Sequence, residues 1–262
     1  MELVAPDGVS LHVEVDGTGA PVTVLAHGLT NSCMELAAFT PFVTGTKVRF
    51  CFRGHGHAGR AAPGRYGFAD YAADLRTVAD ATGATAAVGT SLGAGALTRV
   101  ITDTPDRFDR LVFLLPASFD RPVVGHPLSL RVAELLETFP KGEAIERILR
   151  ESGRDRSYAE NPGLREFDLL LWQDLDPLGV AEAIRGIIGE VAATDPAALA
   201  AVTAPALVIA REGDGLHPMA AARDLAAALP DAELIELASE EDLFASIPVL
   251  LERVATFLAP AD

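Results

Sequence analysis

The chain has 262 residues, 49% of them hydrophobic, which is enough to bury the core of one α/β domain. Its 21 basic and 37 acidic residues give a formal net charge of −16, which would repel the phosphates of a nucleic acid or of a membrane surface, so we expect neither as a partner. Because the first residues lack a basic and apolar leader and no run approaches 18 apolar residues, we expect a cytoplasmic protein with two free thiols, Cys33 and Cys51.

The first third of the sequence predicts a hairpin, two buried strands and a helix. Two short alternating runs flank Pro6-Asp7-Gly8, which is a turn signal, and therefore predict an antiparallel hairpin. Further along, two apolar runs predict buried strands, and apolar residues recurring at the spacing of one helix face predict a helix. In chain order these elements are Glu2–Ala5, Ser10–Val15, Val22–Ala26, Lys47–Phe52 and the helix Phe68–Thr82.

The same alternation of strand and helix patterns continues in two later parts of the chain. The predicted strands are Ala84–Val88, Leu111–Leu115, Pro205–Ala210 and Glu233–Leu237, and the predicted helices are Leu92–Thr104, Pro218–Leu229 and Leu243–Leu258. Strands separated by helices imply right-handed crossover connections. We therefore predict an α/β fold with a mostly parallel sheet and helices on both faces.

Between residues 117 and 202 this alternation stops. The segment carries helical patterns interrupted by prolines, namely Leu128–Phe139, Ala144–Glu151, Leu164–Gln173 and Val180–Val191. We interpret it as a helical lid inserted into a core domain made of residues 1–116 and 203–262. The run Phe167–Trp172 is apolar enough to face either a covered pocket or the core domain.

Gly89-Thr90-Ser91-Leu92-Gly93 is the motif that carries chemistry. It fits Gly-x-Ser-x-Gly and lies between the apolar run Ala84–Val88 and a helical pattern that begins at Leu92. On such a strand-to-helix turn the serine hydroxyl is exposed, and glycines are needed because a Cβ would clash with the neighbouring chain. The pattern also occurs in ordinary Gly/Ser turns, but its position favours a nucleophile elbow, in which the N–H of Leu92 points from a helix N-terminus towards a developing negative charge.

Four motifs together make the chain resemble the α/β-hydrolase family: Val24-Leu25-Ala26-His27-Gly28, Arg53-Gly54-His55-Gly56, the elbow at Ser91, and Ala210-Arg211-Glu212-Gly213-Asp214. The resemblance implies an eight-stranded sheet with an inserted lid and a serine, acid and histidine triad in that chain order. It implies Ser91 as the nucleophile, Asp214 as the acid, a structural role for His27, and an oxyanion hole formed by the N–H groups of Leu29 and Leu92. Asp214 also fits a simple turn former.

The histidine of such a triad is missing from its expected place. Related hydrolases carry it between the last strand and the last helix, where this chain has Ser239-Glu240-Glu241-Asp242. An imidazole can take a serine proton near neutral pH, whereas a carboxylate is a poorer base. Either Glu241 or Asp242 approaches Ser91 and Asp214, or these acids only begin the last helix in solvent. His217, three residues after Asp214 and before Pro218, is the candidate base; the alternative is a noncatalytic His-Pro turn.

Other candidate residues also have structural interpretations, which the sequence favours for Cys51 and for His126. His55 and His57 form a His-x-His pair, but a closed metal site needs three or four ligands, so we expect no metal. His126 reaches the pocket or lies in a surface turn. Cys51 fits a small packing residue better than a nucleophile, because burial disfavours the thiolate. Asp120 is either a substitute acid or the partner of its neighbour Arg121 in an ion pair.

Three hypotheses for function follow from these patterns. The first is a serine hydrolase that acts on a small, apolar ester, thioester or lactone. The second is a non-hydrolytic enzyme on the same scaffold, such as a cyclase, lyase or isomerase, motivated by the missing histidine. The third is a ligand-binding protein without turnover. No cofactor is expected, because the sequence has neither Gly-x-Gly-x-x-Gly after the first strand nor Gly-Lys-Ser/Thr.

Overall fold

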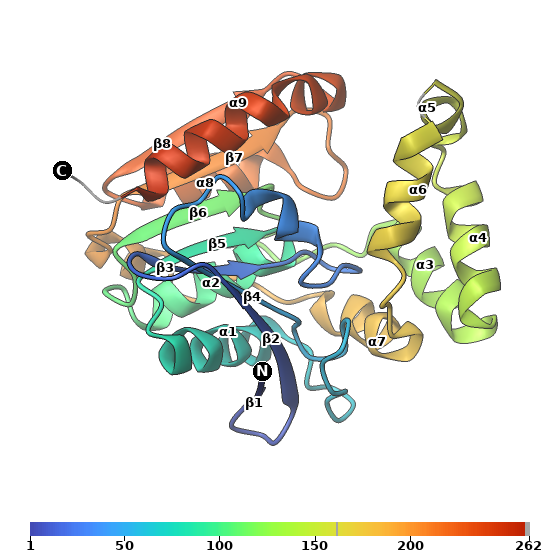
Figure 1. Ribbon diagram of the computed structural model, residues 1–262, viewed down its shortest axis with the longest axis horizontal. Coiled ribbons are helices and arrows are strands. Elements are labelled where there is room, and N and C mark those ends of the chain that lie inside the picture. Colours follow the sequence, from blue (N-terminus) through green and yellow to red (C-terminus); the bar gives the residue numbers. More distant parts are fainter. Residues whose placement is uncertain (161, 260–262) are drawn as a thin grey trace.

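The fold is built on one eight-stranded sheet, described here from a computed structural model that covers residues 1–160 and 162–259 (Figure 1). Its strands are β1 (Glu2–Val4), β2 (Ser10–Asp16), β3 (Val22–Ala26), β4 (Thr46–Phe50), β5 (Ala86–Thr90), β6 (Arg110–Leu114), β7 (Ala206–Arg211) and β8 (Ala232–Leu237). They lie in the order β1-β2-β4-β3-β5-β6-β7-β8. β1 and β2 pair antiparallel, β2 pairs antiparallel with β4, and every later pairing is parallel, which confirms the predicted fold class.

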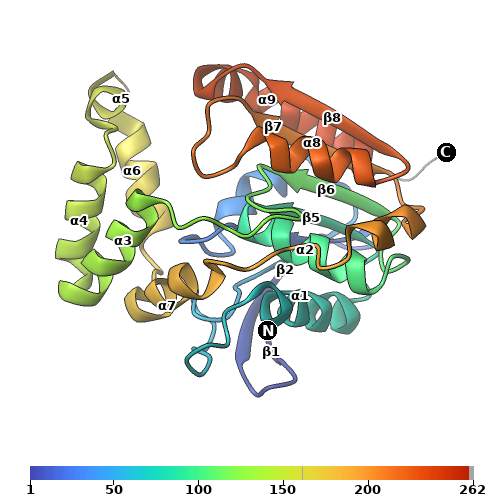
Figure 2. The same cartoon turned by 180° about the vertical axis from the view of Figure 1, so that it is seen from behind.

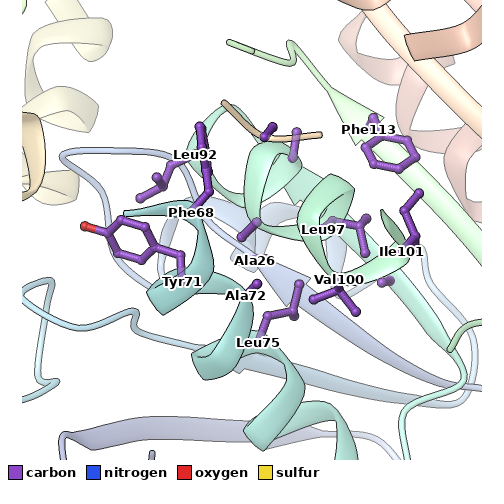
Figure 3. Packing of buried hydrophobic residues seen from close by; sticks show 14 of the residues in the cluster. Ala26, Phe68, Tyr71, Ala72, Leu75, Leu92, Leu97, Val100, Ile101 and Phe113 are labelled. Atoms are coloured by element: carbon purple, nitrogen blue, oxygen red, sulfur yellow. The ribbon is translucent and has the colours of Figure 1, made fainter. Parts of the chain in front are cut away.

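Helices cover both faces of the sheet. The helices α1 (Phe68–Thr82), α2 (Leu92–Asp103) and α8 (Met219–Ala228) pack on one face, and α9 (Glu240–Leu258) packs on the other. Figure 3 shows the interior of the first face, to which α1 contributes Leu75, α2 contributes Leu97 and β6 contributes Phe113. Parallel strands buried from both sides explain the apolar runs of the sequence.

Local signals set the ends of these helices. Asp70 accepts a hydrogen bond from the N–H of Gly67 at the start of α1, and Gly83 ends that helix with a left-handed φ of +68°. α9 begins at Glu240, three residues earlier than predicted, because the Ser239 side chain accepts a hydrogen bond from the N–H of Asp242. Strand β4 ends at Phe50, two residues before the predicted end, so Cys51 lies in the following loop.

Within the described residues, five α-helices occur between β6 and β7, in the segment interpreted from sequence as a lid. They are α3 (Pro127–Thr138), α4 (Lys141–Glu151), α5 (Asp155–Glu160), α6 (Pro162–Leu171) and α7 (Pro177–Ile187), and they gather on one side of the sheet (Figures 1 and 2). α3, α4 and α7 share a small apolar core of their own. α7 starts earlier than predicted because Asp176 caps its N-terminus and Pro177 fits its first turn. Sequence patterns did not predict α5 or the short 3₁₀ helices η1 (Glu35–Phe39) and η2 (Pro196–Ala201).

The Arg53-Gly54-His55-Gly56 motif anchors the loop after β4. The Arg53 guanidinium is buried and donates to the carboxylates of Asp74 on α1 and Asp7 in the N-terminal hairpin. His55 is also buried, and its Nδ1 lies 2.9 Å from the backbone oxygen of Arg53. A buried cation must be paired to avoid a large desolvation cost, so the motif ties three segments together.

Among the described residues no helix is long and apolar enough to span a membrane.

Candidate active site

Ser91 occupies a strained turn between β5 and α2. Its φ of +48° and ψ of −104° lie outside the regions that side-chain-bearing residues favour. Gly89 and Gly93 permit this turn, because a Cβ on Gly89 would meet the backbone of Gly93, and one on Gly93 would meet the carbonyl oxygen of Ala26 at the end of β3. Such strain persists only where the surrounding packing enforces it, as it does here at the carboxyl edge of the sheet.

Ser91, His217 and Asp214 form one hydrogen-bonded chain. His217 Nε2 lies 2.9 Å from Ser91 Oγ, and His217 Nδ1 lies 3.0 Å from Asp214 Oδ2. With the Nδ1 proton directed at the carboxylate, Nε2 is the acceptor that faces the serine hydroxyl. The sequence left open whether His217 was only part of a turn; the geometry gives it the contacts that a general base requires.

The Asp214 carboxylate is held in place from several sides. Its Oδ1 accepts hydrogen bonds from the backbone N–H groups of Leu216 and His217, and Arg211 lies 2.9 Å from Oδ2. Burial alone would raise the pKa of Asp214, but the hydrogen bond with His217, with further help from Leu216 and the charge of Arg211, holds it at about 2. This carboxylate is therefore ionised at neutral pH and able to orient and stabilise a charged imidazole.

The turn before α9 contributes no side chain to the hydrogen bonds among Ser91, His217 and Asp214. Asp242 accepts a hydrogen bond from the N–H of Ala238 and, with Ser239, caps the helix. Glu241 is exposed, and neither acid lines the cavity at Ser91. The sequence-based alternative of a carboxylate pair with Asp214 is thus not formed, because the cap holds these side chains at the helix N-terminus.

The loop after β3 supplies the second candidate oxyanion donor. The N–H of Leu29 donates no hydrogen bond within the described residues, and Leu92 is the first residue of α2, where an N–H has no intrahelical acceptor. Beneath them His27 is buried; its Nε2 accepts from the N–H of Phe52, so its Nδ1 donates to the carbonyl oxygen of Gly28. Burial lowers the pKa of His27 to about 3, which fits the structural role implied by the resemblance.

A cavity of about 460 Å³ opens above Ser91. It lies between the ends of β3, β5, β6 and β7 and the helices α3 and α7, and its walls are largely apolar, including Val123, Ile184 and Ile187. His126 lines it as the N-cap of α3, where its Nδ1 accepts from the N–H of Leu128, so it is more than a surface turn. The predicted pocket residues around Phe167 do not line it: Phe167 and Leu170 are about half exposed on α6.

Glu35 is a cavity residue that sequence patterns did not single out. Its Oε2 accepts from the N–H of Gly28 and its Oε1 from Asn31 Nδ2, both at 2.6 Å. Enclosure by the cavity walls raises the pKa of Glu35 to about 7, although both hydrogen bonds act to lower it. Its one visible signal is an acidic residue within the apolar stretch that follows the oxyanion loop.

Three other candidate residues take no part in the hydrogen bonds among Ser91, His217 and Asp214. Asp120 is exposed at the cavity mouth, where it lies 3.9 Å from Arg121. It does not replace the acid, because Asp214 contacts the imidazole of His217. His57 is exposed and lies 3.5 Å from Asp174. Cys51 is buried beside Cys33, and both cysteines are free thiols.

A model of a known protein family matches the sequence of this chain. The family model described as the alpha/beta hydrolase family matches residues 23–240, which is most of the chain. The chain belongs to the α/β-hydrolase family. No curated protein matches the sequence significantly.

Several solved structures resemble this fold over almost the whole chain. The enol-lactonase from Burkholderia xenovorans LB400 has a TM-score of 0.79 and 22% identity, over 98% of this chain and 99% of that one. An esterase from Exiguobacterium antarcticum has a TM-score of 0.77 and 17% identity, over 98% of both chains. The bottromycin epimerase BotH, in complex with bottromycin A2, has a TM-score of 0.73 and 18% identity, over 99% of both. At these identities the likeness shows a shared fold.

Proposed function

We propose that the protein is a serine hydrolase of small, apolar esters, thioesters or lactones, with helices α3–α7 acting as a lid. The observation that carries this proposal is the 2.9 Å contact between Ser91 Oγ and His217 Nε2, in line with the Asp214 carboxylate. A nucleophile, a base within reach of its proton and a group that orients the base are the parts that acyl transfer needs. An enol-lactonase and an esterase among the similar folds support the substrate class.

The reaction begins when Ser91 Oγ attacks the carbonyl carbon as His217 Nε2 takes the hydroxyl proton. The N–H groups of Leu29 and Leu92 donate to the oxyanion, and Asp214 stabilises the imidazolium. When the tetrahedral intermediate collapses, His217 returns the proton to the leaving alcohol or thiol and an acyl-enzyme remains. A water deprotonated by His217 then attacks the acyl carbon, which releases the acid and restores Ser91.

The test compares two histidines that line the same cavity. His217→Ala should lower kcat/KM for a p-nitrophenyl ester by about 10⁴-fold, as expected for loss of a triad member, and should abolish labelling of Ser91 by a fluorophosphonate probe. His126→Ala is the matched control, since it contacts the helix α3 cap and not Ser91, and it should retain labelling. Unchanged labelling in His217→Ala would refute the proposed base.

A non-hydrolytic isomerase or lyase is the second candidate. Glu35 favours it, because a carboxyl with a pKa of about 7 in the same cavity can exchange protons with a bound substrate. The epimerase among the similar folds lends support. Substrate turnover that survives in Ser91→Ala but is lost in Glu35→Gln would establish this chemistry in place of hydrolysis.

A further inference from the structure

A second group of reactive side chains lies outside the cavity, where β2 meets β4. We call His12, Glu14, Cys33 and Cys51 the thiol–imidazole cluster. The antiparallel register pairs Glu14 with Arg49 and Val13 with Phe50, and the N–H of Cys51 donates to the carbonyl oxygen of His12. His12, Glu14 and Cys51 therefore project from the same face of the strand pair. Cys33, from the loop after β3, closes over them.

The ligand atoms of this cluster are close together. His12 Nε2 lies 3.3 Å and Cys33 Sγ lies 3.5 Å from Glu14 Oε1, and these three atoms are all within 4.8 Å of one another. Cys33 and Cys51 lie together in one small buried cluster. Around tetrahedral zinc, neighbouring ligand atoms are about 3.3 to 3.8 Å apart, given bonds of about 2.0 to 2.3 Å. The separations of 3.3 and 3.5 Å at Glu14 Oε1 already match that spacing.

We propose that the thiol–imidazole cluster binds one Zn²⁺ through Cys33, Cys51, His12 and Glu14. Two thiolates and an imidazole are ligands that select zinc over Mg²⁺ or Ca²⁺, which prefer sets of oxygen atoms. Loss of both thiol protons, with Glu14 ionised, gives three negative charges, which Zn²⁺ and the Arg49 guanidinium at 2.8 Å from Glu14 Oε2 neutralise. Both cysteines are buried while His12 is a third exposed, so the ion enters from the imidazole side.

The site has a structural role that does not depend on the proposed hydrolysis. Its ligands come from β2, from the loop after β3 and from the end of β4, so a bound ion would tie these three segments together. No metal motif is visible in the sequence because the ligands are spread over 40 residues, from position 12 to position 51. Cys33 also lies two residues before Glu35, so the ion would fix the far end of the oxyanion loop.

Cobalt spectroscopy and zinc competition test the proposal on the reduced, full-length protein. One equivalent of Co²⁺ should give visible d–d bands together with thiolate-to-cobalt charge-transfer absorption, and Zn²⁺ should displace it. Cys33→Ser, Cys51→Ser and His12→Ala should each weaken Zn²⁺ binding against a chromophoric chelator by more than about tenfold. Glu2→Gln is the matched control, because Glu2 pairs with His12 on β1 but contributes no ligand atom, and it should stay within about twofold.

Either of two binding results would overturn the site. One is Co²⁺ binding without charge-transfer absorption, which would place the ion on histidine and carboxylate groups elsewhere; the other is unchanged affinity in both serine variants. If a variant does not fold, the wild type still decides the matter. Zn²⁺, but not Mg²⁺, should slow alkylation of Cys33 and Cys51, and equal alkylation rates with both ions would refute the proposal.

Discussion

Replacing Glu35 by glutamine separates its role in the cavity from its role in folding. The carboxylate accepts two hydrogen bonds at 2.6 Å, from the N–H of Gly28 and from Asn31 Nδ2. A glutamine has one acceptor oxygen and one NH₂ donor, so one of these two donors loses its acceptor. A hydrogen bond to a charged group contributes about 1.5 to 3 kcal/mol, which corresponds to roughly 10- to 150-fold in rate if the loss is felt in the transition state.

We expect this loss in kcat rather than in KM. Glu35 holds Gly28, whose neighbour Leu29 is the proposed oxyanion donor, and the oxyanion exists only after attack on the carbonyl. The assay is steady-state hydrolysis of a p-nitrophenyl ester by wild type, by Glu35→Gln and by the double variant Glu35→Gln/Asn31→Asp. In the double variant the new amide accepts from Gly28 and donates to the new carboxylate, so most of the kcat should return. Equal kcat in all three proteins would refute the reasoning.

Stability should move in the opposite direction. In the folded protein the pKa of Glu35 is about 7, above the 4.5 of an ordinary glutamate, so the folded state holds this proton more tightly than the unfolded chain does. The carboxyl therefore costs stability progressively as the pH rises from about 4.5 to 7. Glu35→Gln removes that cost, and its melting temperature at pH 8 should equal or exceed that of wild type. A large drop would assign Glu35 a mainly structural role.

Two further predictions concern folding. Gly93→Ala should lower the free energy of unfolding by about 3 kcal/mol or more, because its Cβ would overlap the backbone of β3. The control Gly142→Ala, which has open space in α4, should leave the free energy of unfolding unchanged or raise it by up to about 1 kcal/mol. Urea titrations measure both variants, and equal midpoints would contradict the packing argument. Burial lowers the pKa of His27 to about 3 and that of His55 to about 4, from 6.5 in the unfolded chain, so unfolding takes up protons below pH 6.5 and each histidine should cost about 2 kcal/mol of stability by pH 5. The measurement uses Glu35→Gln, because the titration of Glu35 has the opposite effect over this pH range. An unfolding free energy of this variant that is flat between pH 7 and 5 would show that the two rings are not buried in the neutral form.

Most of the fold is predictable from sequence because its signals are local. The turn around Ser91 is fixed by its flanking glycines, and the buried parallel strands appear as apolar runs. The helices α9 and α7 each begin three residues before their predicted starts, because Ser239 and Asp176 cap them. The family match confirms the resemblance that these motifs carry.

The arrangement of the site is only partly predictable. The sequence places Ser91 and Asp214 at the ends of strands, but whether His217 faces the serine depends on the path of the loop after β7. Sequence patterns do not single out Glu35, because its hydrogen bond with the N–H of Gly28 forms only when the loop after β3 folds back. The pairing of β2 with β4 in the same way brings His12 and Glu14 next to Cys51, which is far from them in the chain.

Only Gly215 and Leu216 separate the carboxylate of Asp214 from the imidazole of His217. Because this connection is so short, the Asp214 carboxylate and the His217 imidazole stay close together when the loop between β7 and α8 shifts. In the proposed mechanism, the turn between β8 and α9 supplies no catalytic group. Circular permutation can therefore place new chain termini in that turn without separating Ser91, His217 and Asp214 from one another. An enzyme whose general base follows the last strand does not allow this.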